Sequence, residues 1–152
     1  MRKRILIVLA VITAMVFTST FASAQTKTVS RYNGSTYTHA DKYDDCIVVN
    51  GVDVSVYQKT TDWKKAKADG IDFAIIRVGG RGYGAAGNMY ADDYFKKNIE
   101  GAKAAGLMVG IYFFSQAINE LEAVAEANYA LELLGDYDLD LPVFMDYEFS
   151  GG

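Results

Sequence analysis

The sequence predicts an α/β fold built around a parallel β-sheet. From Val48 onward, apolar segments rich in β-branched residues alternate with segments of helical spacing, in the order βαβαβαβ. The expected strands are apolar almost throughout rather than alternating, which is typical of a parallel sheet covered on both faces. This pattern allows a doubly wound sheet or a (β/α) barrel, and in both architectures functional groups gather at the carboxyl ends of the strands.

Four segments are predicted as strands because β-branched and aromatic residues dominate them. They cover residues 47–58, 71–80, 107–117 and 141–149. The last segment, LPVFMDYEF, runs directly from apolar residues into acidic ones.

Three segments between these strands are predicted as helices, since each combines helical spacing or a polar cap with a glycine at its end. They are residues 60–70, with Thr60 or Thr61 as cap and Gly70 as stop; residues 91–106, with Phe95, Ile99 and Ala102 on one face and Gly106 as stop; and residues 119–135, with Asn119 as cap, Glu122 in the capping-box position and Gly135 as stop.

The N-terminus has the composition of a secretory signal peptide, residues 1–24. Three basic residues precede an apolar run, and Ala22 and Ala24 form an A-x-A cleavage pattern. An uncleaved membrane anchor is the less favoured alternative, because the apolar run is shorter than the ~20 residues of a spanning helix. Residues 25–47 are polar, without a clear period, and are predicted to be a linker or a mobile N-terminal arm.

The composition excludes several classes of function. Removing three of the 15 basic residues with the signal segment leaves 12 against 19 acidic ones, a net charge of −7. Nucleic acid and anionic membranes are therefore not expected as partners. Cys46 is the only cysteine and His39 the only histidine, which leaves no disulfide framework, no zinc cluster and little basis for a Ser-His-Asp or Cys-His site. We expect no cofactor.

Polar side chains follow the apolar part of three predicted strands, near their carboxyl ends. They are Asp53, Ser55 and Gln58 on the first strand, Tyr112, Ser115 and Gln116 on the third, and Asp146 and Glu148 on the fourth. Because the carboxyl ends of parallel strands meet at one edge of the sheet, these groups are expected to converge on one pocket.

Asp146 and Glu148 are two residues apart on a predicted strand, so their side chains point to the same side, with Cα atoms ~6.6 Å apart. Two carboxyl groups this close in a partly apolar setting cannot both ionise freely, and we expect the pKa of one to rise. Glycoside hydrolysis needs this arrangement, with a protonated acid at the leaving oxygen and a charged group beside the developing cation. The same pair could hold a divalent metal, or be a solvated strand end without a catalytic role.

The segment GYGAAG, with Gly82, Gly84 and Gly87, matches the G-x-G-x-x-G pattern of dinucleotide-binding loops. Such a site also needs an acidic residue at the end of the next strand, whereas the third strand ends in YFFSQA. We therefore expect a flexible loop at the mouth of the site rather than a dinucleotide site.

Four ordered motifs resemble glycoside hydrolase family 25, the Chalaropsis-type lysozymes or N-acetylmuramidases. They are GVDVSVYQ, DWKKAKADGIDFAIIRVG, DDYFKKNIEGAKAAGLMVGIYFFSQA followed by EAVAEANYAL, and LPVFMDYE, and they cover about Val48 to Ser150. The resemblance implies an irregular TIM-like (β/α) barrel. It also implies metal-free hydrolysis of the β-1,4 bond between N-acetylmuramic acid and N-acetylglucosamine in peptidoglycan.

The resemblance implies roles for individual residues as well. Glu148 matches the general acid of the family's D-x-E motif. Asp146 matches its partner carboxylate, which orients the substrate's acetamido group or stabilises the charged transition state. Asp53 matches an active-site aspartate and Tyr112 a tyrosine that lines the site, whereas Phe113 stands where many members have histidine, so a hydrogen bond there is expected to be absent. The further residues expected to bind substrate are Gln58, Ser115 and Gln116.

Only about the first four βα units of such a barrel are covered by the resemblance. We therefore interpret residues 48–152 as the N-terminal half of a catalytic domain, in a truncated, secreted or cell-wall-associated chain whose last strand has a bare apolar edge. One alternative is a peptidoglycan-binding fragment without catalytic activity. Another is a different barrel hydrolase such as a chitinase, which is disfavoured because Phe144 stands where a longer acidic motif needs an acid.

Overall fold

The computed structural model describes residues 25–29, 34, 36–84 and 86–148, so the predicted signal peptide lies outside the described residues. The strands are β1 (Gln25–Val29), β2 (Thr36–Ala40), β3 (Gly51–Val54), β4 (Phe73–Arg81), β5 (Met89–Ala91), β6 (Met108–Ser115) and β7 (Val143–Tyr147). The helices are η1 (Asp41–Tyr43), η2 (Val56–Gln58), α1 (Trp63–Ala68), α2 (Phe95–Ala104) and α3 (Glu120–Leu134). Within this part of the chain, no helix is both long and apolar enough to cross a membrane.

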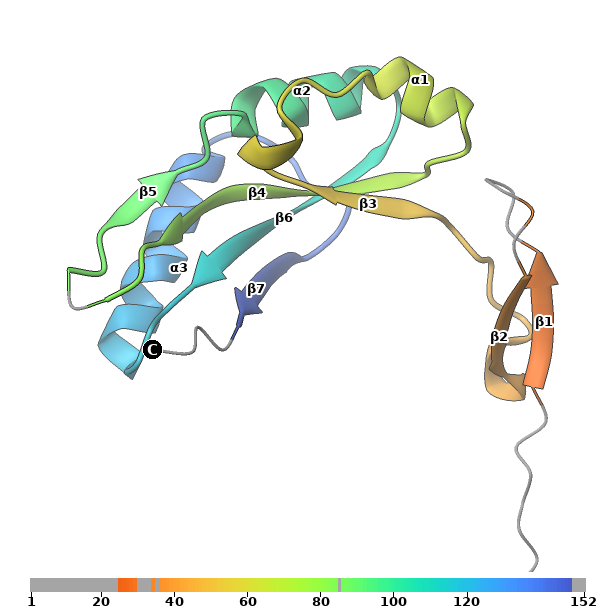
Figure 1. Cartoon of the computed structure of the whole chain (residues 1–152), viewed down its shortest axis with the longest axis horizontal. Helices are drawn as coiled ribbons and strands as arrows, with labels where there is room; N and C mark the ends of the chain where they lie inside the picture. Colours follow the sequence, from red (N-terminus) through yellow and green to blue (C-terminus); the bar gives the residue numbers. More distant parts are fainter. Residues whose placement is uncertain (1–24, 30–33, 35, 85, 149–152) are drawn as a thin grey trace, which may run out of the picture.

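The main sheet has five strands, four of which are parallel in the order β3-β4-β6-β7 (Figure 1). Neighbours among these four are also consecutive parallel strands of the chain, so the chain crosses the sheet in one direction. A doubly wound sheet would instead reverse its direction at a switch point. The short strand β5, which the sequence did not predict, pairs antiparallel with the end of β4.

The three predicted helices are present, and their ends follow the predicted signals in most cases. Gly70, Gly106 and Gly135 end the helices with positive φ angles of 94°, 73° and 57°. The predicted cap of α3 is confirmed, because the N–H of Glu122 donates to Asn119 Oδ1 at 3.0 Å. The cap predicted for α1 is wrong: Asp62, not a threonine, caps this helix.

Residues 25–47, predicted to be a linker or a mobile arm, contain regular structure instead. β1 and β2 pair antiparallel, with Gln25 opposite Ala40 and Val29 opposite Thr36, and η1 follows. Figure 1 shows this hairpin beside, not within, the main sheet. The sequence gives no strand signal here because β2 is exposed or half-buried along its length and has no apolar face.

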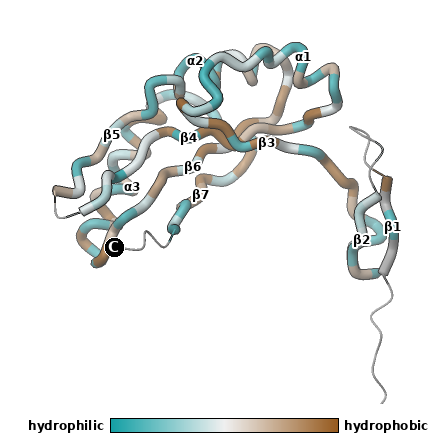
Figure 2. Tube along the Cα trace, viewed as in Figure 1, coloured by the Kyte–Doolittle hydropathy of each residue, from teal (hydrophilic) through white to brown (hydrophobic). Residues whose placement is uncertain are grey.

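One face of the main sheet forms the core with the helices. Side chains alternate along β4 and β6, and the set that faces the helices is at most 4% exposed: Ala74, Ile76 and Val78 on β4, and Val109, Ile111 and Phe113 on β6. The hydrophobic colours of Figure 2 accordingly concentrate where β3, β4 and β6 run side by side. The expectation that both faces are covered is wrong for the described residues, because the opposite face carries exposed Asp53 and Phe144.

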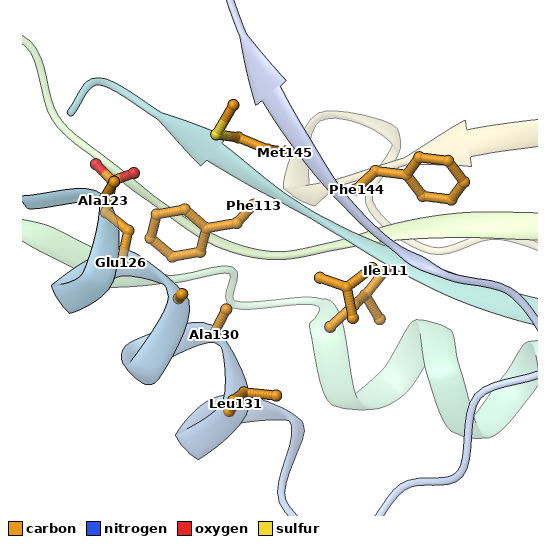
Figure 3. Close-up of a pocket in the computed structure, with 10 residues that line it drawn as sticks. Ile111, Phe113, Ala123, Glu126, Ala130, Leu131, Phe144 and Met145 are labelled. Carbon is orange, nitrogen blue, oxygen red and sulfur yellow. The ribbon is translucent and has the colours of Figure 1, made fainter. Parts of the chain in front are cut away.

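β7 is the last strand of the described sheet and pairs only with β6 there. On its helix-facing side, an apolar groove of about 260 Å³ lies between β7 and α3. Figure 3 shows Ile111 and Phe113 from β6 turned toward Ala130 and Leu131 of α3 in this groove. Met145 at its rim is 70% exposed, so the predicted bare apolar edge is present in the described part of the chain.

Candidate active-site groove

The open face of the main sheet holds two adjoining cavities of about 350 and 340 Å³. Four residues line both cavities: Asp53, Tyr112, Asp146 and Glu148. We call the combined space the carboxylate groove. Its other lining residues are Ile75 and Phe144 in the first cavity, and Ser55, Tyr57, Gln58, Arg77, Tyr83, Tyr90 and Phe114 in the second.

Strand register explains why these side chains meet. Asp53 on β3 pairs with Ile75 on β4, and Phe114 on β6 pairs with Asp146 on β7, so the acidic residues occupy one face of the sheet near the strand ends. Glu148 follows β7 by one residue and lies on the same face as Asp146, as their spacing of two predicts. The groove therefore brings together six of the eight polar residues that were predicted to converge, including Ser55 and Gln58.

Tyr112 lies between the acidic residues of the groove. Burial raises the pKa of its phenol, the negative charges of Asp53 and Asp146 raise it further, and Arg77 and a hydrogen bond with Ser55 partly oppose this rise. The phenol is consequently protonated throughout the neutral range, so its O–H can donate a hydrogen bond to a ligand in the groove.

Ser115 and Gln116, predicted to bind substrate, lie elsewhere. Ser115 is 1% exposed and its Oγ donates to Glu126 Oε2 of α3 at 2.6 Å, while the N–H of Gln116 donates to Glu126 Oε1 at 3.3 Å. Side chains alternate along β6, so Ser115, three residues after Tyr112, points to the helix-facing side. Phe113 also faces that side, where its ring contacts Tyr129 edge to face. A histidine at position 113 would face the same side and would therefore not place a hydrogen bond in the groove.

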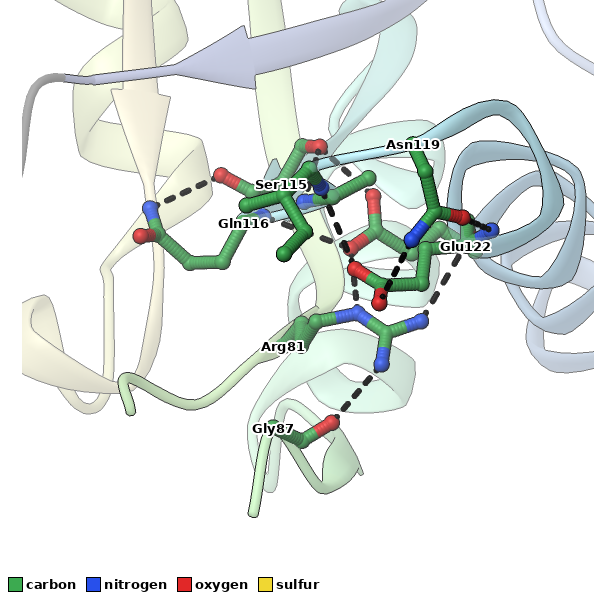
Figure 4. A network of polar contacts seen from close by, with 9 residues as sticks. Arg81, Gly87, Ser115, Gln116, Asn119 and Glu122 are labelled. Carbon is green, nitrogen blue, oxygen red and sulfur yellow. Dashed lines mark hydrogen bonds and ion pairs between the residues drawn. The ribbon is translucent and has the colours of Figure 1, made fainter. Parts of the chain in front are cut away.

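Glu126 is the centre of a polar network that joins the ends of β4 and β6 to α3. Figure 4 shows this network, with Arg81, Gly87 and Ser115 among the labelled residues. Besides Ser115, Glu126 binds Arg81 at the end of β4, with 2.6 Å between Arg81 Nε and Glu126 Oε1. Arg81 also donates through Nη1 to the carbonyl of Gly87 at 2.9 Å. The network thus binds Gly87, at the end of the GYGAAG segment that connects β4 and β5. Tyr83 of this segment lines the groove, in agreement with the predicted position of the segment at the mouth of the site.

Arg77 and Asp92 form a buried ion pair beneath the groove, with side chains 9% and 0% exposed and 2.7 Å between Nε and Oδ2. Asp92 also accepts hydrogen bonds from the N–H groups of Val56 and Tyr94, both at 2.9 Å. Burial lowers the pKa of Arg77, but the hydrogen bond and charge of Asp92 outweigh this effect and the net shift is upward. The guanidinium is therefore a permanent positive charge beside the acidic groups.

Sequence reasoning did not single out Arg77, Asp92 or three of the four tyrosines of the groove, Tyr57, Tyr83 and Tyr90. One signal was available: Arg77 interrupts the apolar run FAIIRVGG, and a charged residue in a buried strand requires a partner. The tyrosines gave no comparable signal, because Tyr57 lies in η2 whereas Tyr83 and Tyr90 belong to the β4–β5 hairpin, and only the fold brings these segments together.

His39 and Cys46 lie apart from the groove, on β2 and in the segment that follows η1. Cys46 is an exposed free thiol. Among the described residues, no group of three or more His, Cys, Asp or Glu side chains is arranged to hold a metal ion.

The family model described as Glycosyl hydrolases family 25 matches residues 52–152. The chain belongs to this family. All the residues of the carboxylate groove fall within the matched segment.

Three proteins illustrate this relationship. Lysozyme M1 of Streptomyces globisporus is 33% identical over 105 residues, which are 67% of this chain and 33% of the relative. The bacterial lysozyme from Streptomyces coelicolor is 31% identical with a TM-score of 0.54, over 66% of this chain and 45% of that one. The muramidase from Acremonium alcalophilum is 28% identical with a TM-score of 0.53, over 64% and 45%. The chain thus spans about a third of the curated relative and under half of these solved chains.

Proposed function

We propose that this chain is part of a secreted lysozyme that hydrolyses the β-1,4 bond between N-acetylmuramic acid and N-acetylglucosamine in peptidoglycan. The observation that carries the proposal is the convergence of Asp53, Asp146 and Glu148 in one groove of a family 25 chain. Relatives named as lysozymes or muramidases support the choice of substrate.

In this proposal Glu148 is the general acid and donates its proton to the glycosidic oxygen as the bond breaks. Asp146, on the same face of β7, stabilises the positive charge that develops on the sugar or orients the acetamido group. Asp53 approaches from the other side of the groove, and the protonated hydroxyl of Tyr112 donates a hydrogen bond to the bound saccharide. Gln58 supplies a further polar contact.

We further propose that β3, β4, β6 and β7 belong to an irregular (β/α) barrel whose interior is the face that carries the groove. Consecutive parallel strands with the helices on one face support this assignment. In the same proposal, residues 1–24 are a signal peptide that directs export, residues 25–47 are an N-terminal extension, and residues 48–152 belong to the catalytic domain.

The test is the release of reducing ends from purified peptidoglycan by residues 25–152, compared among the parent chain, Glu148→Gln and Glu100→Gln. Glu100 is an exposed glutamate of α2, outside the groove, and serves as the matched control. We expect activity in the parent and in Glu100→Gln, and a loss of at least ~100-fold in Glu148→Gln, in line with removal of a general acid. Full activity in Glu148→Gln would refute the assignment, and binding without any release by the parent would favour a saccharide-binding fragment.

A further inference from the structure

We propose that Tyr57 and Tyr83 form a stacking platform for a sugar ring next to the carboxylates, held in place by the buried Arg77–Asp92 pair and by Arg81. The inference rests on the proposed function, and it adds a saccharide subsite to the catalytic groove. The ligand is a neutral hexosamine unit of a glycan chain, because one face of such a ring is apolar while its rim carries hydroxyl groups.

The two rings are open to solvent although they belong to a cavity. Tyr57 is 80% exposed and Tyr83 is 63% exposed, and both line the cavity of about 340 Å³ that also contains Asp53, Asp146 and Glu148. A tyrosine ring has an apolar face and a polar hydroxyl. It therefore suits a ligand such as a sugar ring, which has one apolar face and solvated hydroxyl groups at its edge. A sugar on these rings would therefore lie in direct continuity with the carboxylates.

The ring of Tyr57 contacts the positively charged guanidinium of Arg77. The Arg77 guanidinium carbon lies 5.1 Å from the centre of this ring, within the range of a cation–π interaction. Asp92 fixes both parts of the contact, since one carboxylate oxygen accepts from Arg77 Nε at 2.7 Å and from the N–H of Val56 at 2.9 Å. The guanidinium of Arg77 and the backbone next to Tyr57 are thus bound by the same carboxylate oxygen of Asp92.

The ring of Tyr83 is restrained by a contact with another aromatic ring. It meets Phe114 of β6 edge to face, with centroids 5.7 Å apart and planes at 76°. Its hairpin is closed by the hydrogen bond from the N–H of Gly82 to the carbonyl of Asn88 at 3.0 Å, and is attached to α3 through Arg81. Each ring therefore has a contact that restrains it in the absence of ligand, and such restraint lowers the entropy lost on binding.

The platform is tested by co-sedimentation of the chain with purified insoluble peptidoglycan, on ice and with short incubation to limit turnover. The variants are Tyr57→Ala, Tyr83→Ala and Tyr57→Phe, and Trp63 fluorescence establishes that each is folded. The control is Tyr43→Ala, since Tyr43 is 48% exposed and also contacts a cation, Lys42, but lies outside the groove. We expect at least about fivefold weaker binding for each alanine variant, and binding within about twofold of the parent for Tyr57→Phe and the control.

The outcomes separate the two proposals. Unchanged binding in both Tyr57→Ala and Tyr83→Ala, with binding by the parent intact, would overturn the platform and leave the catalytic assignment standing. Weakened binding of the alanine variants supports the platform even if Glu148→Gln fails to abolish hydrolysis. A parent chain that does not bind peptidoglycan at all would overturn the platform, whereas the catalytic assignment is judged by the release of reducing ends.

Discussion

Replacing Asp92 by alanine should destabilise the fold severely. The substitution leaves the guanidinium of Arg77 buried without a counter-charge, and removing one partner of a buried ion pair costs about 3–5 kcal/mol. It also leaves two backbone N–H groups, those of Val56 and Tyr94, without their acceptor, each worth about 1 kcal/mol. The terms are not additive, so we expect a loss of about 4–6 kcal/mol, against a total stability of about 5–15 kcal/mol for a typical domain.

The measurement is urea unfolding followed by the fluorescence of Trp63, the only tryptophan and a buried core residue. At about 1–3 kcal/mol per molar urea, the midpoint should fall by more than ~1 M. Asp92→Asn should lose less, because the amide oxygen still accepts a hydrogen bond. The control is Asp69→Asn in the exposed Lys65–Asp69 pair, whose side chains are 69% and 43% exposed, where we expect less than about 1 kcal/mol. A loss below about 1 kcal/mol in Asp92→Ala would refute the role of the pair.

Three further substitutions test other parts of the structure. Asn98→Leu should raise the free energy of unfolding by about 1 kcal/mol, because both amide atoms of Asn98 are buried without a partner in the described part of the chain; a lower urea midpoint would contradict this. Gly51→Ala should destabilise by about 1–3 kcal/mol, since a β-carbon there would overlap the ring of Phe73, and an unchanged midpoint would argue against this close packing. The raised pKa of Tyr112 makes the folded state retain a proton that the unfolded state loses above about pH 10, so stability should fall as the pH rises from that value. Tyr112→Phe should weaken this alkaline decline in a series of urea midpoints, and an identical decline would contradict the assignment.

The order of strands and helices could be predicted because periodicity and glycine positions specify it locally. The apolar run of β4 and the spacing of Phe95, Ile99 and Ala102 in α2 correspond to buried faces in the structure. The β1–β2 hairpin could not be predicted, since β2 has no apolar face. The cap of α1 was missed because Thr60, Thr61 and Asp62 are all competent caps, and only the backbone decides which one accepts from Lys65.

The candidate site could be predicted in part. The convergence of Asp53, Asp146 and Glu148 in one groove could be predicted, because acids follow the apolar parts of these strands and the carboxyl ends of parallel strands meet at one edge of the sheet. Ser115 does not line the groove, because side chains alternate along β6 and Ser115 therefore faces α3, opposite to Tyr112. The tyrosine platform depends on contacts between segments distant in sequence, such as Tyr83 with Phe114, and these become visible only in the folded chain.

The most direct test of the central claim is the identity of the sugar at the newly formed reducing end. Peptidoglycan digested with residues 25–152 is reduced with borohydride and hydrolysed, and the resulting amino-sugar alcohols are identified by mass spectrometry. Cleavage after N-acetylmuramic acid predicts muramitol as the product, absent in Glu148→Gln. Glucosaminitol in place of muramitol, or muramitol at the parent level in Glu148→Gln, would contradict the account.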